Sequence, residues 1–144
     1  MVMAAAGAAA HVGAFKAGIQ LAKQLGAKVT GYYAIDPLPP HVYEGGYSIG
    51  GLALVKALER RAREIGQKHL DGMARLAAST GIAFSAVVGK AETPYEGIIQ
   101  AAKKYKCDVI FMASHGRRGL ADLIMGSVTH KALTHSKLPV LVYR

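Results

Sequence analysis

The residues best suited to bind a ligand lie between positions 108 and 129. Five apolar residues, Val109 to Ala113, come first and predict a strand buried on both faces. A polar, basic, glycine-containing segment follows, and Gly126 and Ser127 then open a helical pattern. Ser127 is a good helix N-cap, and Gly126 lets another group approach the backbone closely. Because the free N–H groups and the dipole of a helix start attract anions, this order of elements predicts a phosphate site.

Enzyme motifs with stricter requirements do not occur in the sequence. It contains no Gly-x-x-x-x-Gly-Lys-Ser/Thr motif, which excludes a P-loop. Its six histidines form no His-Glu-x-x-His pair or comparable metal-ligand set. Ser114 and His115 are adjacent, but neighbouring loop residues rarely converge on one proton, and no carboxylate stands nearby to orient the imidazole. We therefore predict neither catalytic nor metal-binding residues, and we expect His115 to shape its loop.

The spacing of glycines in this segment resembles the nucleotide-binding signature of the universal stress proteins. That signature is a glycine, two residues, a second glycine, nine residues, and then glycine with serine or threonine. Here Ala113 stands at the first position and Gly116 at the second, and nine residues separate Gly116 from Gly126 and Ser127. The closing LPVLVYR is also similar to the last strand of that family. The resemblance covers the whole chain and is strongest from Tyr95 onward.

The resemblance implies an adenine-nucleotide site with ATP as the expected ligand, accompanied by Mg²⁺ or Mn²⁺ where a metal takes part. Adenine would lie near the ends of the first two strands, against the backbone of Ala34 and an apolar wall that includes Met112. The ribose would lie near Ala6 and Ala113, and the phosphates would extend over residues 116 to 129. The residues expected to bind the ligand are Ala6, Ala34, Met112, Ala113, Gly116, Arg117, Gly126, Ser127, Val128 and Thr129.

Two of these positions depart from the family pattern. Ala113 replaces a glycine, which adds one methyl group and is expected to be tolerated. Ala6 stands where relatives usually carry an aspartate at the end of the first strand, inside an alanine-rich run that continues to Ala10. The substitution removes a carboxylate that could hold the ribose or a metal ion, so it is expected to weaken the site more than Ala113 does.

Composition limits the class of protein. A chain of 144 residues with 51% hydrophobic residues fits one domain with a substantial core, covering residues 1–144. Charges or glycines interrupt every apolar run before it reaches membrane length, and the N-terminus does not resemble a signal peptide. The single cysteine, Cys107, excludes an internal disulfide and is expected to be a packing residue. We expect a cytoplasmic protein with no membrane partner.

Alternating apolar patterns predict five strands and four helices. The expected strands are Val2–Ala6, Ala27–Ile35, Ile82–Val88, Val109–Ala113 and Pro139–Tyr143, and the expected helices are Val12–Leu25, Leu52–Thr80, Tyr95–Lys106 and Val128–His135. Strands alternating with helices predict an α/β fold with a parallel sheet covered on both faces, as in Rossmann-like domains. The resemblance implies the strand order 3-2-1-4-5 of the adenine nucleotide alpha hydrolase-like fold. Gly66 and Gly72 make a kink in the long helix possible.

The favoured function is an adenine-nucleotide-binding stress or regulatory protein with little or no turnover, because the motif lacks an evident catalytic base or water-positioning acid. The alternative is a slow ATPase or a self-phosphorylating protein with Ser127 or Thr129 as acceptor. The net charge of +9 raises a third reading, a charge-driven nucleic-acid binder. No recognised module supports that reading, so no specific nucleic acid is expected. The apolar strand Pro139–Tyr143, expected at a sheet edge, indicates a homodimer.

Overall fold

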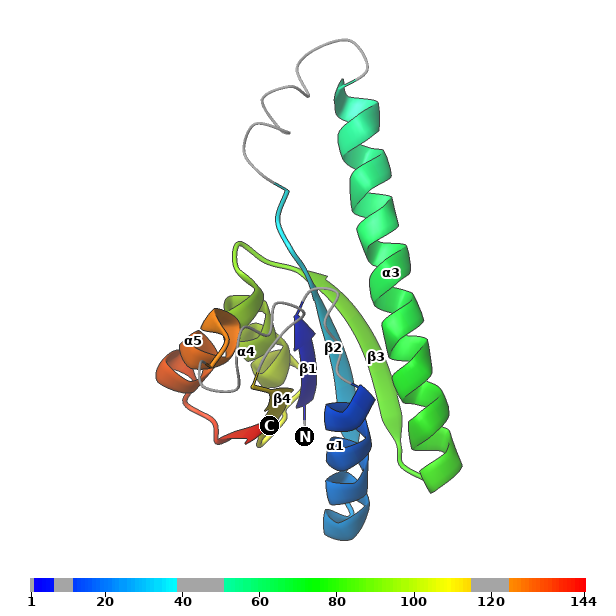
Figure 1. Cartoon of the computed structure of the whole chain (residues 1–144), viewed down its shortest axis with the longest axis vertical. Coiled ribbons are helices and arrows are strands. Elements are labelled where there is room, and N and C mark those ends of the chain that lie inside the picture. Colours follow the sequence, from blue (N-terminus) through cyan, green and yellow to red (C-terminus); the bar gives the residue numbers. More distant parts are fainter. Residues whose placement is uncertain (1, 7–11, 39–50, 115–124) are drawn as a thin grey trace.

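The computed structural model describes residues 2–6, 12–38, 51–114 and 125–144, with residues 2–6 and 12 described by their backbone only. Strands and helices alternate along these segments (Figure 1). The strands are β1 (Val2–Ala6), β2 (Val29–Ile35), β3 (Phe84–Lys90), β4 (Ile110–Ala113) and β5 (Val140–Tyr143). The helices are α1 (Val12–Leu25), α3 (Gly51–Thr80), α4 (Pro94–Lys104) and α5 (Ser127–His135).

The five strands form one parallel sheet in the order β3-β2-β1-β4-β5. Helices α1 and α3 cover one face of the sheet, and α4 and α5 cover the other (Figure 1). The predicted α/β, Rossmann-like class is therefore confirmed, and the strand order is the one that the family resemblance implied. Since β1 leads to β2 on one side and its other neighbour is β4, the strand order reverses between β1 and β4.

Strand β2 runs through the middle of the core and serves both faces. Tyr33 and Ile35 join the apolar cluster under α1 and α3, while Tyr32 and Ala34 join the cluster under α4 and α5. The imidazole of His69 on α3 stacks on Tyr33, with ring centroids 5.6 Å apart. His69, which is partly buried, therefore lies at the edge of the core.

Three helices end in the same way, and this moves several predicted boundaries. After α1, α3 and α4, the residue two positions past the cap donates its N–H to a carbonyl five residues earlier, as in a Schellman motif: Ala27 to Ala22, Ile82 to Ala77 and Cys107 to Ala102. Gly26 and Gly81 supply the left-handed backbone, with φ of 60° and 75°. Because these N–H groups close a helix, β2 and β3 each begin two residues later than predicted.

Helix α3 runs without interruption through Gly66 and Gly72, so glycine here does not mark a break. Gly66 is buried over the ring of Tyr33, and a Cβ at this position would lie 2.6 Å from Tyr33 Cδ1. The glycine lets the helix backbone approach the sheet closely.

Tyr32, on the opposite face of the sheet, also packs closely against a glycine. Its side chain is 4% exposed, and a Cβ added to Gly97 on α4 would lie 2.5 Å from its hydroxyl oxygen but 3.4 Å from Cζ. Burial, and secondarily the neighbouring Tyr105, raise the pKa of Tyr32 above its usual value. The phenol therefore fills this space in its neutral form, with its hydroxyl directed at the Gly97 backbone.

We predict that the effect of Gly97→Ala on stability changes sign with the residue at position 32. In the parent protein, strain of about 1–3 kcal/mol from overpacking should outweigh the gain of about 1 kcal/mol in helix propensity. In a Tyr32→Phe background the clashing oxygen is gone, and the nearest atom is the Cβ of Ala91 at 3.2 Å, which must shift by only a few tenths of an ångström. The same substitution should then be neutral or stabilising. Urea unfolding of the parent, both single variants and the double variant measures this cycle. Equal effects in the two backgrounds would refute the packing argument.

Candidate functional site

The carboxyl ends of three neighbouring strands meet at one edge of the sheet. Ala6 on β1 is in register with Ala34 on β2. Ala4 on β1 is in register with Met112 on β4, so Ala6 and Ser114 each stand two residues beyond the same pair. In open α/β sheets a ligand crevice forms outside the strand ends where the order reverses, which here is between β1 and β4.

Hydrogen bonds fix the start of α5 against this edge. The N–H of Gly126 donates to the carbonyl of Ser114 at 2.8 Å, and the N–H of Ser114 donates to the carbonyl of Tyr143 at 2.7 Å. The Thr129 hydroxyl donates to the carbonyl of Ala113 at 2.9 Å. The first turn of α5 is therefore held beside the end of β4 by both backbone and side-chain contacts.

The N-cap of α5 is Gly126, with φ −59° and ψ 144°, and Ser127 is the first helical residue. The prediction that Ser127 is the N-cap is wrong by one residue. The Gly126 carbonyl accepts the first intrahelical bond, from the N–H of His130 at 2.9 Å, which defines it as the cap. A glycine cap places no side chain of its own over the helix start.

Three backbone donors lie at the start of α5. The N–H groups of Ser127, Val128 and Thr129 belong to the first turn, where an α-helix provides no intrahelical acceptor. Among the described residues no side chain caps them, and the first turn contains no acidic residue. In the part of the chain that the structure describes, the start of α5 thus combines N–H donors that no side chain caps with the positive end of the helix dipole, which suits a phosphate group.

Thr129 has a different role from the one expected. Its side chain is 4% exposed, and its hydroxyl proton is donated to Ala113. The hydroxyl proton thus joins α5 to β4 and is not available for donation to a ligand. Ser127 is exposed, and its hydroxyl remains available for a ligand.

Ala34 and Met112 both lie in the apolar cluster beneath α4 and α5. Both side chains are buried there, at 2% and 5% exposure. Ala113 follows Met112 at the end of β4 and is partly exposed. Gly116 and Arg117 lie outside the described residues, as does the side chain of Ala6. Of the expected site, the structure thus brings together the ends of β1, β2 and β4 and the start of α5.

Comparison with known proteins identifies the fold. The sequence profile described as the universal stress protein family matches residues 1–144. The chain belongs to this family. Universal stress protein MJ0531 of Methanocaldococcus jannaschii is 29% identical over 131 residues, which cover 91% of this chain and 73% of that protein.

Solved universal stress proteins share the same architecture. One in complex with cAMP superposes with a TM-score of 0.68 at 16% identity, covering 100% of this chain and 97% of that one. A family member from Arabidopsis thaliana with AMP bound gives a TM-score of 0.64 at 15% identity, covering 99% and 90%. At these identities the likeness shows the fold.

Other kinds of site find little support in the described part of this universal stress protein. No group of three or more His, Cys, Asp or Glu side chains among the described residues is arranged to hold a metal ion. None of the helices described is both long and apolar enough to cross a membrane.

Two anchors of the site were not predicted from the sequence: the contact of the Thr129 hydroxyl with Ala113, and the bond from Ser114 to the last residue of β5. The only signal for the first was a threonine near a helix start that follows a buried strand. Nothing in the sequence signals the second, because a backbone bond between distant segments leaves no trace in residue type.

Proposed function

We propose that this universal stress protein binds adenine nucleotides, ATP in particular, in the crevice between the carboxyl ends of β1 and β4. The observation that carries the proposal is the glycine-capped start of α5, whose first-turn N–H groups adjoin the strand ends at the point where strand order reverses. Gly126, Ser127 and Val128 would hold the phosphates, and Thr129 would contribute its N–H group. Arg117 would add positive charge from the loop.

The base and ribose would occupy the strand ends next to this phosphate site. The backbone of Ala34 at the end of β2 would face the adenine, with Met112 beneath it, and Ala6 and Ala113 would flank the ribose. Gly116 would allow the loop backbone to approach the phosphates. Support for an adenine nucleotide comes from the family members in complex with cAMP and with AMP. A Mg²⁺ or Mn²⁺ ion would reach this site with the phosphates.

We infer binding with little or no turnover, in a stress-related regulatory role in the cytoplasm. The described part of the site offers no carboxylate to orient an attacking water, and the first turn of α5 has no acidic residue. Thr129 is also a poor phosphate acceptor, because its hydroxyl is buried against the sheet.

Mass spectrometry of the ligand released from freshly purified, denatured protein tests the assignment. We expect an adenine nucleotide in near-stoichiometric amount, and incubation of the protein with ATP should leave the triphosphate intact over many binding cycles. Release of a different cofactor would refute the assignment. Steady formation of ADP would instead support the slow ATPase.

Restoring the missing acid should strengthen the site. Ala6→Asp would place a carboxylate at the end of β1, beside the ends of β2 and β4. A hydrogen bond to a charged group is worth about 1.5–3 kcal/mol, so ATP affinity should rise about tenfold or more. Titrations with and without Mg²⁺ separate a ribose contact, which needs no metal, from a metal contact. An unchanged affinity in both series would show that the acid at this position does not limit binding.

A further inference from the structure

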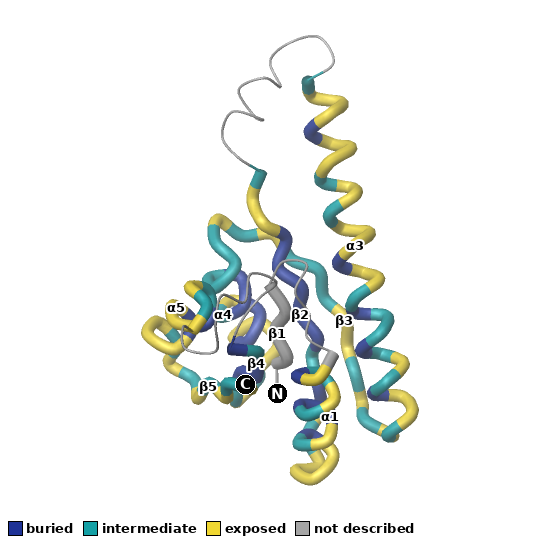
Figure 2. The backbone as a smooth tube through the Cα atoms, in the orientation of Figure 1, coloured by how far each residue is buried: buried dark blue, intermediate teal, exposed yellow. Residues whose placement is uncertain are grey.

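An exposed apolar stripe follows one side of the long helix α3. Leu54, Leu58 and Ile65 are 57%, 37% and 36% exposed. At steps of four and seven residues they share one side of the helix. Figure 2 shows that exposed positions dominate the N-terminal half of α3. Large apolar side chains grouped in this way on a surface mark an interaction site more often than isolated ones do.

The stripe does not belong to the core of the domain. The side of α3 that faces the core is different from the side that carries the stripe. Its buried residues are Val55, Gly66, Leu70, Met73 and Ala77. Among the described residues, α3 enters the apolar clusters only from Ala62 onward.

A contact on the opposite flank holds the projecting part of α3 in place. The Lys90 ammonium, at the last residue of β3, pairs with the Glu59 carboxylate, and this hydrogen bond lowers the pKa of Glu59. The two turns before Glu59 therefore extend past the end of β3, by about 12 Å at 1.5 Å per residue. In Figure 1, α3 extends beyond the strands in the same way. Leu54 and Leu58 of the stripe therefore lie on the part of α3 that projects past the sheet.

Basic residues border the stripe on its solvent side. Arg61 lies three residues after Leu58, and Lys68 lies three residues after Ile65, so each is next to a member of the stripe. Both are exposed, and neither makes an ion pair with another described residue. The nearby acids are engaged elsewhere, Glu64 with Arg60 at 3.9 Å and Asp71 with Gln67 at 2.8 Å.

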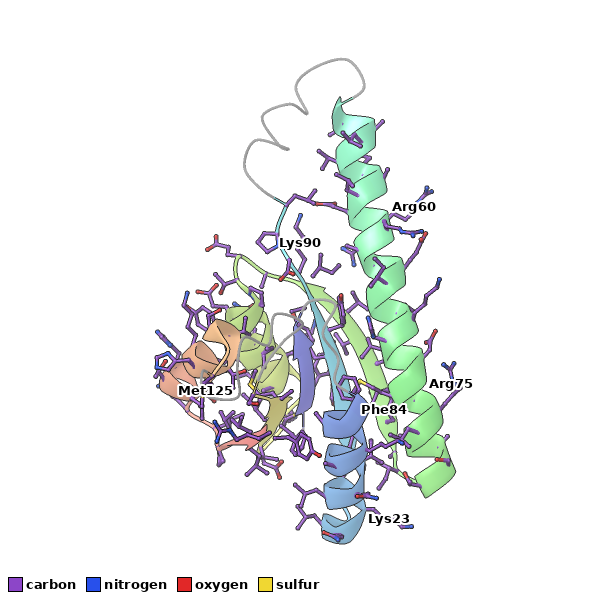
Figure 3. The ribbon with its side chains drawn as sticks, in the orientation of Figure 1. Lys23, Arg60, Arg75, Phe84, Lys90 and Met125 are labelled. Atoms are coloured by element: carbon purple, nitrogen blue, oxygen red, sulfur yellow. The ribbon has the colours of Figure 1, made fainter. Side chains whose placement is uncertain are left out.

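The charges beside the stripe indicate what kind of partner could bind there. A second copy of the chain docked through the same stripe would bring Arg61 and Lys68 against the same cations, which is unfavourable. Figure 3 shows Arg60 and Arg75 pointing away from the sheet, on the solvent side of α3. An anionic bilayer would need a broad apolar face to enter as well as these charges, whereas Leu58 and Ile65 are only 37% and 36% exposed. An acidic amphipathic helix fits both the apolar stripe and the cations beside it. Its leucine-type side chains would cover the stripe, and its carboxylates would reach Arg61 and Lys68.

We propose that α3, from Leu54 to Lys68, is a docking surface for an acidic amphipathic helix of another protein. The probe is a fluorescein-labelled helical peptide of about 18 residues, with leucines on one face and glutamates along both flanks. Arg61→Glu/Lys68→Glu should weaken its binding by about tenfold or more, because like charges then face each other. A peptide with lysines in place of the glutamates should bind this charge-reversed variant better than it binds the parent.

Matched controls come from the other flank of the same helix. Lys56→Glu/Arg63→Glu changes the net charge equally, and Leu52→Ser matches Leu58→Ser, since Leu52 is 60% exposed. We expect the controls to retain binding and Leu58→Ser to lose it. Equal loss in test and control pairs, absence of peptide binding, or preferential binding to phosphatidylserine vesicles would overturn the proposal. Binding of ATP should be unchanged in all these variants, which separates this surface from the nucleotide site.

Discussion

Gly126→Val is expected to lower ATP affinity by roughly 100-fold, or about 2.7 kcal/mol, without unfolding the protein. An N-cap side chain normally lies over the first-turn N–H groups that it caps. Glycine leaves that position free for a phosphate, whereas valine fills it with apolar atoms. The backbone angles at Gly126 suit any residue, and its N–H can still donate to Ser114, so the fold should persist. Calorimetric titration measures the loss, and circular dichroism checks folding.

Gly126→Asp provides the sharper companion experiment. An aspartate at the N-cap accepts hydrogen bonds from the same N–H groups and interacts favourably with the helix dipole. Stability should be unchanged or higher by a few tenths of a kcal/mol, while phosphate binding is lost to competition and repulsion. Ser127→Ala is the mild control and should cost about 1 kcal/mol, because the backbone donors remain. If either Gly126 variant is folded and binds ATP like the parent, the phosphates do not lie at the start of α5.

We propose that the chain forms a homodimer through β5, and Leu141→Lys should then convert it to a monomer. Strand β5 is the last in the sheet order and pairs with β4 among the described strands, and its Leu141 and Tyr143 are 41% and 39% exposed. An exposed apolar edge of this kind invites pairing with a second copy, and in a two-fold contact each new lysine would approach its symmetry mate. We expect the dissociation constant to rise by roughly 100-fold, measured by sedimentation velocity at micromolar concentration.

The control for this prediction uses the other edge of the sheet. Ala86→Lys on β3 introduces the same charge at an exposed edge position and should leave assembly intact. A parent protein that sediments as a monomer at micromolar concentration would contradict the dimer. Dissociation by the β3 variant would instead locate the contact at the opposite edge.

Local patterns in the sequence predicted the elements well where side chains alone decide them. Helix α1 has the predicted bounds, and α4 begins at Pro94, one residue before the predicted start. The periodicity of apolar residues is visible in a single sequence because it depends on residue type. Boundaries set by backbone bonds were missed: α4 ends at Lys104 because Lys106, with φ 52°, takes the left-handed position usually given to glycine.

The sequence predicted which strand ends and which helix start form the candidate site, but not the N-cap residue or the contact of Thr129. These depend on backbone bonds between distant segments. A glycine before a serine indicates a helix start, yet which of them is the cap depends on backbone angles that tertiary contacts impose. The bonds from Gly126 to Ser114 and from Thr129 to Ala113 make Gly126 the cap and remove Thr129 as a free hydroxyl. Gly66 was likewise read as a weak point of α3, because its partner, Tyr33, lies far away in sequence.

The central claim, an adenine-nucleotide site between β1, β4 and the start of α5, is tested most directly by calorimetric titration of the purified, ligand-free protein with ATP, with GTP as the comparison. The expected result is saturable binding of one ATP per chain, weaker binding of GTP, and loss of the ATP signal in Gly126→Asp. Folded parent protein that shows no saturable binding of ATP, or that binds ATP equally well with aspartate at position 126, would contradict the account.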